Sequence, residues 1–366
     1  LGFSLLHLVR VRIPGDAFER NVYRLGAGIA VMPLLLLIFQ AIGIPLHWLS
    51  FLIASVAGLV IHQVDYWFIK GNINNRKGIF SFAKFNIKWK HVYHVGACIL
   101  ILILFLVYLK GAFGYPYLED DDPWYHAIGA EYVSQFHTYW VDPGLKEHVG
   151  EISIYLWPYP PFYTSMMGIL HQLNDSISWT LKFFDVLLVS LGILFFYVFA
   201  SKLLDSHKFA FIATAFLVLL PSYLSHFIWA ETLAICAFFP AIFSLHMIYE
   251  QGFDKKWFVL AILLIGSNLI IQPWATGIFG FFYGLYWLGR VIVERSLLKS
   301  KYVFLAILLG TVIAMFFWIP SVFIGVGGQK YDYFFSMSQN LFHGDDSLGA
   351  TKYGIGDFIF APKVSK

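Results

Sequence analysis

The chain has 366 residues; 59% are hydrophobic, only 13% are charged, and the formal net charge is +3. Soluble globular domains carry about 25% charged residues, so this composition excludes a soluble protein and requires lipid to cover much of the surface. The small net charge gives no reason to expect nucleic acid as a partner. The two cysteines, Cys98 and Cys236, both lie in apolar runs, which indicates small buried side chains rather than a disulfide framework or a metal site.

Apolar stretches of about 20 residues, the length that crosses a bilayer as a helix, recur along most of the chain. Residues 1–9 are typical of the tail of such a helix, and we interpret the chain as a fragment that lacks residues at both ends. The pattern then predicts nine membrane spans, in chain order 22–43, 47–69, 92–110, 180–203, 208–225, 228–248, 257–273, 274–292 and 302–324.

The distribution of Lys and Arg predicts the orientation of these spans, because basic residues are enriched in cytoplasmic loops. Five basic clusters separate the spans, and placing all of them in the cytoplasm makes the topology alternate without a break. They lie at residues 10–24, 70–90, 202–208, 255–256 and 290–301.

The same topology places 111–179 on the outer side, together with 226–228 and 325–366. The segment 111–179 is rich in carboxylates and too long for an ordinary turn. Within it, 123–139 and 159–173 are aromatic or amphipathic, and we expect both to be helices lying at the membrane interface.

This pattern predicts an all-α polytopic membrane protein in three parts. Residues 1–91 would be additional N-terminal transmembrane helices with a basic cytoplasmic loop. Residues 92–326 would be the transmembrane core, and 327–366 the start of an outer segment. For localisation we favour the plasma membrane of a prokaryote over the endoplasmic reticulum, with the candidate site on the outer or luminal face.

An acidic run directly after span 92–110 is the first candidate site. It includes Asp120 and Asp122 and is followed by Pro123 and aromatic residues. Clustered carboxylates suit hard divalent cations such as Mg²⁺ or Mn²⁺, which can neutralise a diphosphate leaving group. One carboxylate could instead act as a general base. The alternative is purely structural, with Asp122 as the N-cap of a helix and Pro123 at its first position.

An aromatic and proline-rich turn at 157–163 is the second candidate, with Trp157 and Tyr159 as rings that could stack on a sugar. Prolines stiffen this turn, although aromatic residues at this depth also serve as interfacial anchors. The third candidate is Glu231, in the first turn of span 228–248, with His226 as a nearby hydrogen-bond donor for a phosphate. Glu231 could equally be a favourable helix-terminal charge that reaches water.

Three further features have simpler interpretations. Asp185 and Lys182, three residues apart on span 180–203, predict a local helical ion pair. The run 272–274 (Gln-Pro-Trp) predicts a break and an outer turn between two spans. Asn174 begins a glycosylation sequon, which is a common pattern by chance.

Taken in order, these motifs resemble the GT-C superfamily of membrane glycosyltransferases. The closest resemblance is to the catalytic subunit of oligosaccharyltransferase, including its archaeal and bacterial single-subunit forms. The run 122–126 (Asp-Pro-Trp-Tyr-His) is similar to the family's Asp-Pro-aromatic motif, and the run 157–161 is similar to its Trp/Tyr/Pro turn. The run 221–223 (Pro-Ser-Tyr) is similar to the motif that leads to a second acidic position, which here is Glu231. The likeness covers roughly residues 92–325.

The chain departs from the family pattern at several points. Glu231 is a single carboxylate where the family usually has two, and His126-Ala127 stands where a basic residue is usual. The Trp-Trp-Asp acceptor motif is absent. These departures leave two branches open: a metal-dependent transfer from a lipid diphosphate to protein, and a metal-independent transfer from a polyprenyl-phosphate monosaccharide.

The resemblance implies a GT-C-type helical bundle with a cavity open to the outer side. A polyprenyl (dolichyl) phosphate or diphosphate sugar donor would enter from the bilayer, and the acceptor would be a protein or a glycan. Asp122 would be the main catalytic carboxylate. Asp120 and Glu231 would assist it, as metal ligands if Mn²⁺ or Mg²⁺ is used. The substrate-binding residues implied are Trp124, Tyr125, His126, Trp157, Tyr159 and His226.

Two other functional classes stay open. A transporter or flippase for a lipid-linked or small solute would fit the same composition, although transporters tend to carry repeated halves and mid-membrane charges. The charges here fall at the outer edge of the spans, which favours chemistry at the surface. A catalytically inactive scaffold with the same fold would have the same pattern.

Overall fold

A computed structural model describes residues 1–70, 89–119, 121–141, 155–220, 228–251, 253–298 and 300–325. Every regular element within these ranges is a helix. Among the described residues, six helical segments are long and apolar enough to cross a membrane, which makes the chain a multi-pass integral membrane protein. The contacts within the chain divide it into two compact units, Leu1–Trp318 and Ile319–Lys366. The candidate site described below lies in the first unit.

Each of the nine predicted spans contains a helix. The first is divided at Val31 into two helices, where Pro33 stands at the start of the second and cannot donate a backbone hydrogen bond. The helices in the predicted spans are α2 (Ala17–Ala30), α3 (Met32–Ala41), α4 (Trp48–Lys70), α5 (Trp89–Ala112), α9 (Ile177–Leu203), α10 (His207–Val218), α12 (Ala230–Glu250), α13 (Lys255–Asn268), α14 (Pro273–Glu294) and α15 (Lys301–Gly325).

Two of these helices are shorter than the spans predicted for them. α10 has 12 residues and α13 has 14, lengths of about 18 and 21 Å against a hydrocarbon core of about 30 Å. The predictions 208–225 and 257–273 included the apolar residues that follow each helix. In α13 the extension was wrong because the chain turns after Asn268 and Gln272 begins the next helix.

The helix starts follow from local sequence. Asp16 and Glu19 form a reciprocal capping box at the start of α2, in which each side chain bonds the backbone N–H of the other residue. Other helices begin at a residue whose side-chain oxygen accepts from the first turn. These caps are Ser176 for α9, Ser206 for α10, Asp254 for α13 and Gln272 for α14.

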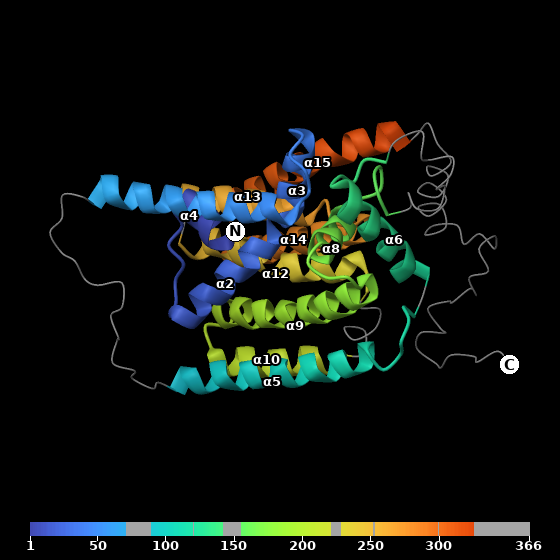
Figure 1. The fold of residues 1–366 in the computed structure, drawn as a ribbon. Helices are drawn as coiled ribbons and strands as arrows, with labels where there is room; N and C mark the ends of the chain where they lie inside the picture. The colour runs from blue at the N-terminus through green and yellow to red at the C-terminus, as the bar shows by residue number, and fades with distance from the viewer. Residues whose placement is uncertain are drawn as a thin grey trace, which may run out of the picture. The chain divides into compact units, whose positions relative to one another are not determined.

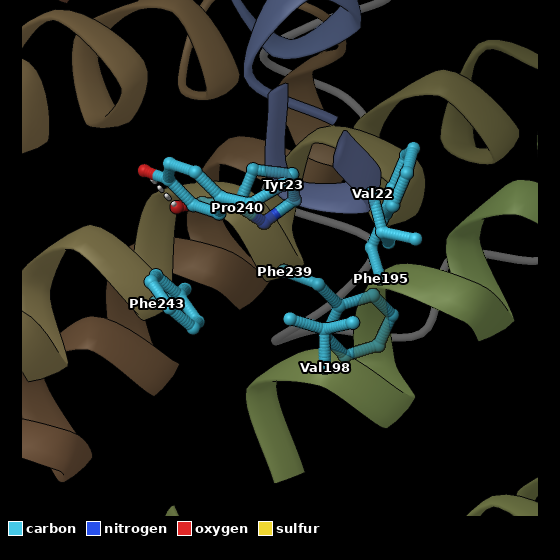
Figure 2. Close-up of a pocket in the computed structure, with 7 residues that line it drawn as sticks. All are labelled: Val22, Tyr23, Phe195, Val198, Phe239, Pro240 and Phe243. Atoms are coloured by element: carbon cyan, nitrogen blue, oxygen red, sulfur yellow. Dashed lines mark hydrogen bonds between the residues drawn. The ribbon is translucent and has the colours of Figure 1, made fainter. Parts of the chain in front are cut away.

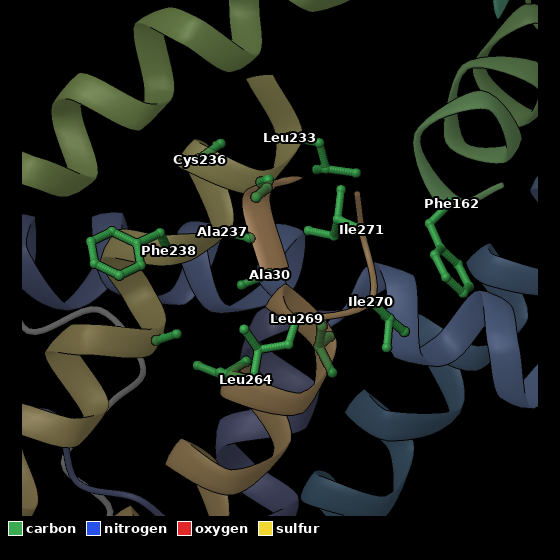
Figure 3. Packing of buried hydrophobic residues seen from close by; sticks show 14 of the residues in the cluster. Ala30, Phe162, Leu233, Cys236, Ala237, Phe238, Leu264, Leu269, Ile270 and Ile271 are labelled. Carbon is green, nitrogen blue, oxygen red and sulfur yellow. The ribbon is translucent and has the colours of Figure 1, made fainter. Parts of the chain in front are cut away.

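Small residues bring α2 and α12 close together within the core. Gly26 lies against the Pro240 ring, where an added Cβ would come within 2.7 Å of it. Ala237 and Cys236 are buried in the same cluster as Ala30 (Figure 3). Because lipid tails are as apolar as the core, helices in a membrane associate through such close packing and through interhelical hydrogen bonds. The Tyr23 hydroxyl supplies one, 2.6 Å from the Ser244 hydroxyl.

The main polar clusters gather at two ends of the helices. α5, α9 and α10 lie side by side (Figure 1). The Asp16 end includes the starts of α2 and α5 and the end of α9. The Asp185 end includes the end of α5 and the starts of α9 and α12. This separation is expected for a membrane protein, because hydrocarbon offers polar groups no hydrogen-bond partners.

Ion pairs hold the Asp16 end together. The buried Glu19 carboxylate lies 3.0 Å from Lys202 Nζ, and Asp16 Oδ2 lies 2.9 Å from Lys90 Nζ and 3.0 Å from His94 Nε2. Burial alone would raise the pKa of Asp16, but the hydrogen bonds from Lys90, the Glu19 amide and His94 together lower it well below its usual range. The segments around Asp16, Lys90 and Lys202, all predicted to lie on the cytoplasmic side, thus meet at this end of the helices.

The segment predicted as the outer loop holds the two expected helices, α6 (Asp121–Phe136) and α8 (Phe162–His171). They cross at Gly129 and Gly168. His171 Nε2 bonds Glu131 Oε2 at 2.8 Å across the same pair. Most of the connection between the two helices, residues 142–154, lies outside the described residues. The outer orientation of the loop remains a prediction.

Replacing Gly168 by alanine is expected to force α6 and α8 apart. An added Cβ would lie 2.6 Å from the Ala130 carbonyl oxygen and 2.8 Å from Val133 Cβ, and overpacking of this kind costs about 1–3 kcal/mol. Thermal unfolding of the purified protein in detergent should therefore show a lower midpoint for Gly168→Ala. Gly280→Ala is the matched control, because a Cβ there meets nothing within 4 Å. Equal midpoints for the two variants would contradict the packing described.

Candidate active site

Asp122 lies in the first turn of α6. The helix begins at Asp121, so the prediction that Asp122 is the N-cap is wrong. Pro123 fits this earlier start because the first four N–H groups of a helix have no intrahelical acceptor. The half-buried Asp122 carboxylate is thus held near a helix N-terminus, where the helix dipole favours negative charge.

Tyr155 is the centre of the contacts around Asp122. Its hydroxyl donates a short hydrogen bond to Asp122 Oδ1. Its ring stacks on His126 with centroids 4.1 Å apart, and it contacts Tyr159 at 5.0 Å and Tyr125 at 6.1 Å. These four rings, which we call the aromatic cluster, limit the positions that the Asp122 side chain can take.

His126 is the buried member of the aromatic cluster. Its Nδ1 lies 2.8 Å from the Thr164 hydroxyl, and its ring meets the edge of Tyr163 at 4.8 Å. Burial lowers the pKa of His126 to about 3, since charging the ring would require desolvating a cation. The imidazole is therefore neutral at physiological pH and positions α6 against α8 rather than carrying charge.

Tyr163 and Asp185 connect this cluster to the transmembrane bundle. The Tyr163 hydroxyl donates to Asp185 Oδ1 at 2.9 Å, and both side chains are fully buried. Burial and the neighbouring carboxylate raise the pKa of Tyr163 well above its usual value, so its phenol stays protonated and can donate. The predicted ion pair between Asp185 and Lys182 is wrong, because Lys182 Nζ instead donates to the Tyr115 carbonyl.

Glu231 extends the polar cluster to two more helices. It lies in the first turn of α12, as predicted, and acts electrostatically on both Asp185 and Tyr163. Its Oε1 accepts a hydrogen bond of 2.7 Å from Gln272 Nε2. Gln272 Oε1 in turn accepts from the Ala275 amide at 2.6 Å and caps α14.

The contacts therefore form one series from Asp122 to Glu231, the two carboxylates singled out in the sequence. It runs through the aromatic cluster to Tyr163, then to Asp185 and Glu231. The series draws together the starts of α6, α9 and α12 with α8. Asp122 and Glu231 do not bond each other directly.

The predicted sugar-binding rings divide into two groups. Trp124 is 42% exposed, and Tyr125 and Tyr159 are half-buried in the aromatic cluster, so these three rings can reach a ligand. Trp157 is buried, with its ring 4.8 Å from that of Trp140 and 5.5 Å from that of Phe317. This makes Trp157 a core residue that fixes the turn before α8.

Two of the predicted site residues, Asp120 and His226, lie outside the described residues. Within the described ranges no three His, Cys, Asp or Glu side chains are grouped closely enough to hold a metal ion. Asp122 and Glu231 thus do not form such a group without further ligands.

A small apolar hollow lies away from this site. It is bounded by α2, α9 and α12 (Figure 2). Phe195, on its wall, is ten residues and about 15 Å further along α9 than Asp185. Its lining offers a ligand little besides the Tyr23 hydroxyl, which faces Ser244. The lining residues are Val22, Tyr23, Phe195, Val198, Phe239, Pro240 and Phe243.

Comparison of the chain with models of known protein families, with curated proteins and with solved structures finds no match. The resemblance to GT-C glycosyltransferases therefore remains a prediction from the order of the motifs.

Sequence reasoning missed Tyr155 as a member of the site, and it gave no site role to Tyr163, the last residue of the candidate turn 157–163, or to Gln272, which it assigned to an outer turn. Tyr155 lies two residues before the aromatic turn, and that proximity was the one available signal. Asp185 carried a stronger signal, as an ionisable residue within a span, but the nearby lysine suggested a local pair. Only the packing of α8 on α9 shows that Tyr163 reaches it.

The low pKa of His126 predicts a loss of stability in acid. The unfolded chain takes up a proton on this ring near pH 6.5, whereas the folded chain does so only near pH 3. Stability from His126 is thus fully present above pH 6.5 and falls as the pH drops towards 3, with a slope of at most about 1.4 kcal/mol per pH unit. His126→Asn, whose amide can replace Nδ1 as the partner of Thr164, should show a shallower fall between pH 6.5 and 4.5. Parallel curves for both proteins in denaturant titrations would refute a buried neutral His126.

Proposed function

We propose that the protein is a membrane glycosyltransferase that moves a sugar or oligosaccharide from a polyprenyl-phosphate or -diphosphate donor to an acceptor. The observation that carries this proposal is the Asp122 carboxylate, which Tyr155 holds within the aromatic cluster at the start of α6. A positioned carboxylate beside accessible aromatic rings suits a reaction between a sugar and a nucleophile.

Asp122 has the geometry of a general base. Oδ1 accepts from Tyr155, and Oδ2 has no hydrogen-bond partner among the described residues. In the proposed reaction Oδ2 takes the proton of an acceptor hydroxyl or amide as that group attacks the anomeric carbon. The bond from this carbon to the phosphate oxygen breaks, and the lipid phosphate leaves with the electron pair.

The aromatic residues are proposed to orient the sugar. Trp124, two residues after Asp122, presents an exposed ring, and Tyr125 and Tyr159 flank Tyr155. Flat rings of this kind bury apolar area with little loss of conformational entropy, and the tyrosine hydroxyls can bond sugar hydroxyls. The isoprenoid tail of the donor would remain in hydrocarbon beside the helices.

Replacing Asp122 by asparagine is expected to lower the rate of sugar transfer about 100-fold or more, because the amide cannot accept the proton. Transfer should be measured with purified full-length protein, a panel of polyprenyl-linked donors, and Mn²⁺, Mg²⁺ or chelator. Tyr155→Phe should lower the rate less, since it keeps the base and removes only its positioning bond. Full activity of a normally folded Asp122→Asn protein would reject the assignment of Asp122.

The dependence on metal separates the two donor branches. Transfer that needs Mn²⁺ or Mg²⁺ would indicate an oligosaccharyltransferase-like site with ligands beyond Asp122 and Glu231. Transfer that survives chelator but not Asp122→Asn would indicate a polyprenyl-phosphate monosaccharide donor with Asp122 as base.

One observation favours a second candidate, a transporter or flippase. Asp185 is a fully buried carboxylate on a membrane-crossing helix with no cationic partner among the described residues. Such residues often belong to ion or proton pathways. Movement of a lipid-linked sugar across liposomes that Asp185→Asn abolishes, without any sugar transfer, would support this candidate over the enzyme.

A further inference from the structure

Lys182 is a buried cation at the Asp185 end of α9. Its side chain is 3% exposed, and Nζ makes one hydrogen bond, of 2.5 Å, to the Tyr115 carbonyl. The Phe113 ring lies 5.7 Å from Nζ. An ammonium carries three donors, so two of its N–H groups have no acceptor among the described residues. An under-satisfied buried charge is costly, which points to a ligand that would supply the missing acceptors.

Two other lysines among the described residues form ion pairs and can be compared with Lys182. Lys90 and Lys202, at the Asp16 end, lie 2.9 and 3.0 Å from carboxylate oxygens. Lys182 is more buried than either, and no carboxylate of the described residues lies within ion-pair distance of it. Glu119 acts on it electrostatically from further away. Asp185, one turn along α9, bonds Tyr163 instead. Its hydrogen-bond partner, the Tyr115 carbonyl, is neutral, which leaves the Lys182 ammonium able to pair with an anion.

The surroundings of Lys182 suit the headgroup of a lipid. Phe113, Tyr115 and Tyr117 are exposed aromatic residues just beyond the end of α5, a placement typical of the membrane interface. Along α5, Leu106 and Val107 are also exposed and can lie against an acyl or isoprenoid chain. A lipid beside α5 would thus bring its headgroup to the level of Lys182.

We propose that Lys182 binds a phosphate group, carried by a membrane lipid, through its two unused N–H donors. The phosphate would approach Nζ next to residues 113–117. These residues lie outside any helix, and the Tyr115 carbonyl accepts the hydrogen bond from Lys182. A charge-assisted bond between ammonium and phosphate is stronger than the bond to a neutral carbonyl. With a polyprenyl phosphate as the lipid, the inference rests on the proposed function and names the residue that anchors the donor.

Binding to the purified full chain in detergent tests this proposal without any measurement of activity. The probes are decaprenyl phosphate, decaprenol, dioleoyl phosphatidic acid and inorganic phosphate, and the readout is the concentration dependence of the unfolding temperature. Lys182→Gln should weaken decaprenyl phosphate binding about tenfold or more, and Lys182→Arg should retain it. Lys110→Gln is the matched control, since Lys110 is an exposed lysine in the last turn of α5.

The outcomes separate the sources of the phosphate. Equal binding of phosphatidic acid, also lost in Lys182→Gln, would support a general phospholipid site, and competition by inorganic phosphate would show that the phosphate alone suffices. The proposal fails if Lys182→Gln binds decaprenyl phosphate like wild type, or if wild type does not distinguish decaprenyl phosphate from decaprenol. The second comparison needs no variant, so it can still refute the proposal if Lys182→Gln does not fold. Absence of sugar transfer would leave this result unchanged.

Discussion

The hydrogen bond from Tyr163 to Asp185 joins the α6–α8 pair to the transmembrane bundle. Both groups are fully buried, and a buried carboxylate without a partner would cost several kcal/mol. The bond therefore fixes α8 against α9 at one position. Since α8 also carries Thr164, which holds His126, the placement of α6 depends on the same contact. Asp122 takes its position at the end of this sequence of constraints.

Most of the fold could be predicted because the membrane imposes strong rules on a sequence. Apolar length and the positions of lysine and arginine predicted a helix in each of the nine spans and the grouping of segments at two ends. The predictions were less accurate where apolar residues continue past a helix end, as after Asn268 in α13. Hydropathy reports which residues avoid water, and it does not report where a turn interrupts the helix.

The candidate site could be predicted only in part. Asp122 and Glu231 were found because each combines charge with a helix start near the membrane surface, which is a local pattern. Tyr155 and Tyr163 act through partners 33 and 22 residues away, and no local spacing encodes such contacts. The Lys182–Asp185 prediction failed for the related reason that both side chains have partners outside α9, Lys182 at the Tyr115 carbonyl after the end of α5 and Asp185 at Tyr163 on α8. Local pairing rules hold when tertiary contacts do not compete.

The side chain of Gln272 has a mechanical consequence. Its carbonyl oxygen is occupied by the Ala275 amide and its nitrogen by Glu231, so turning the amide over would break both bonds at once. The Gln272 side chain thus links the first turns of α12 and α14 in a single fixed orientation. A displacement of the Glu231 carboxylate, for instance by a ligand that approaches it, would pull on the beginning of α14. A change at the candidate site would then be transmitted along a helix that contributes no other residue to it.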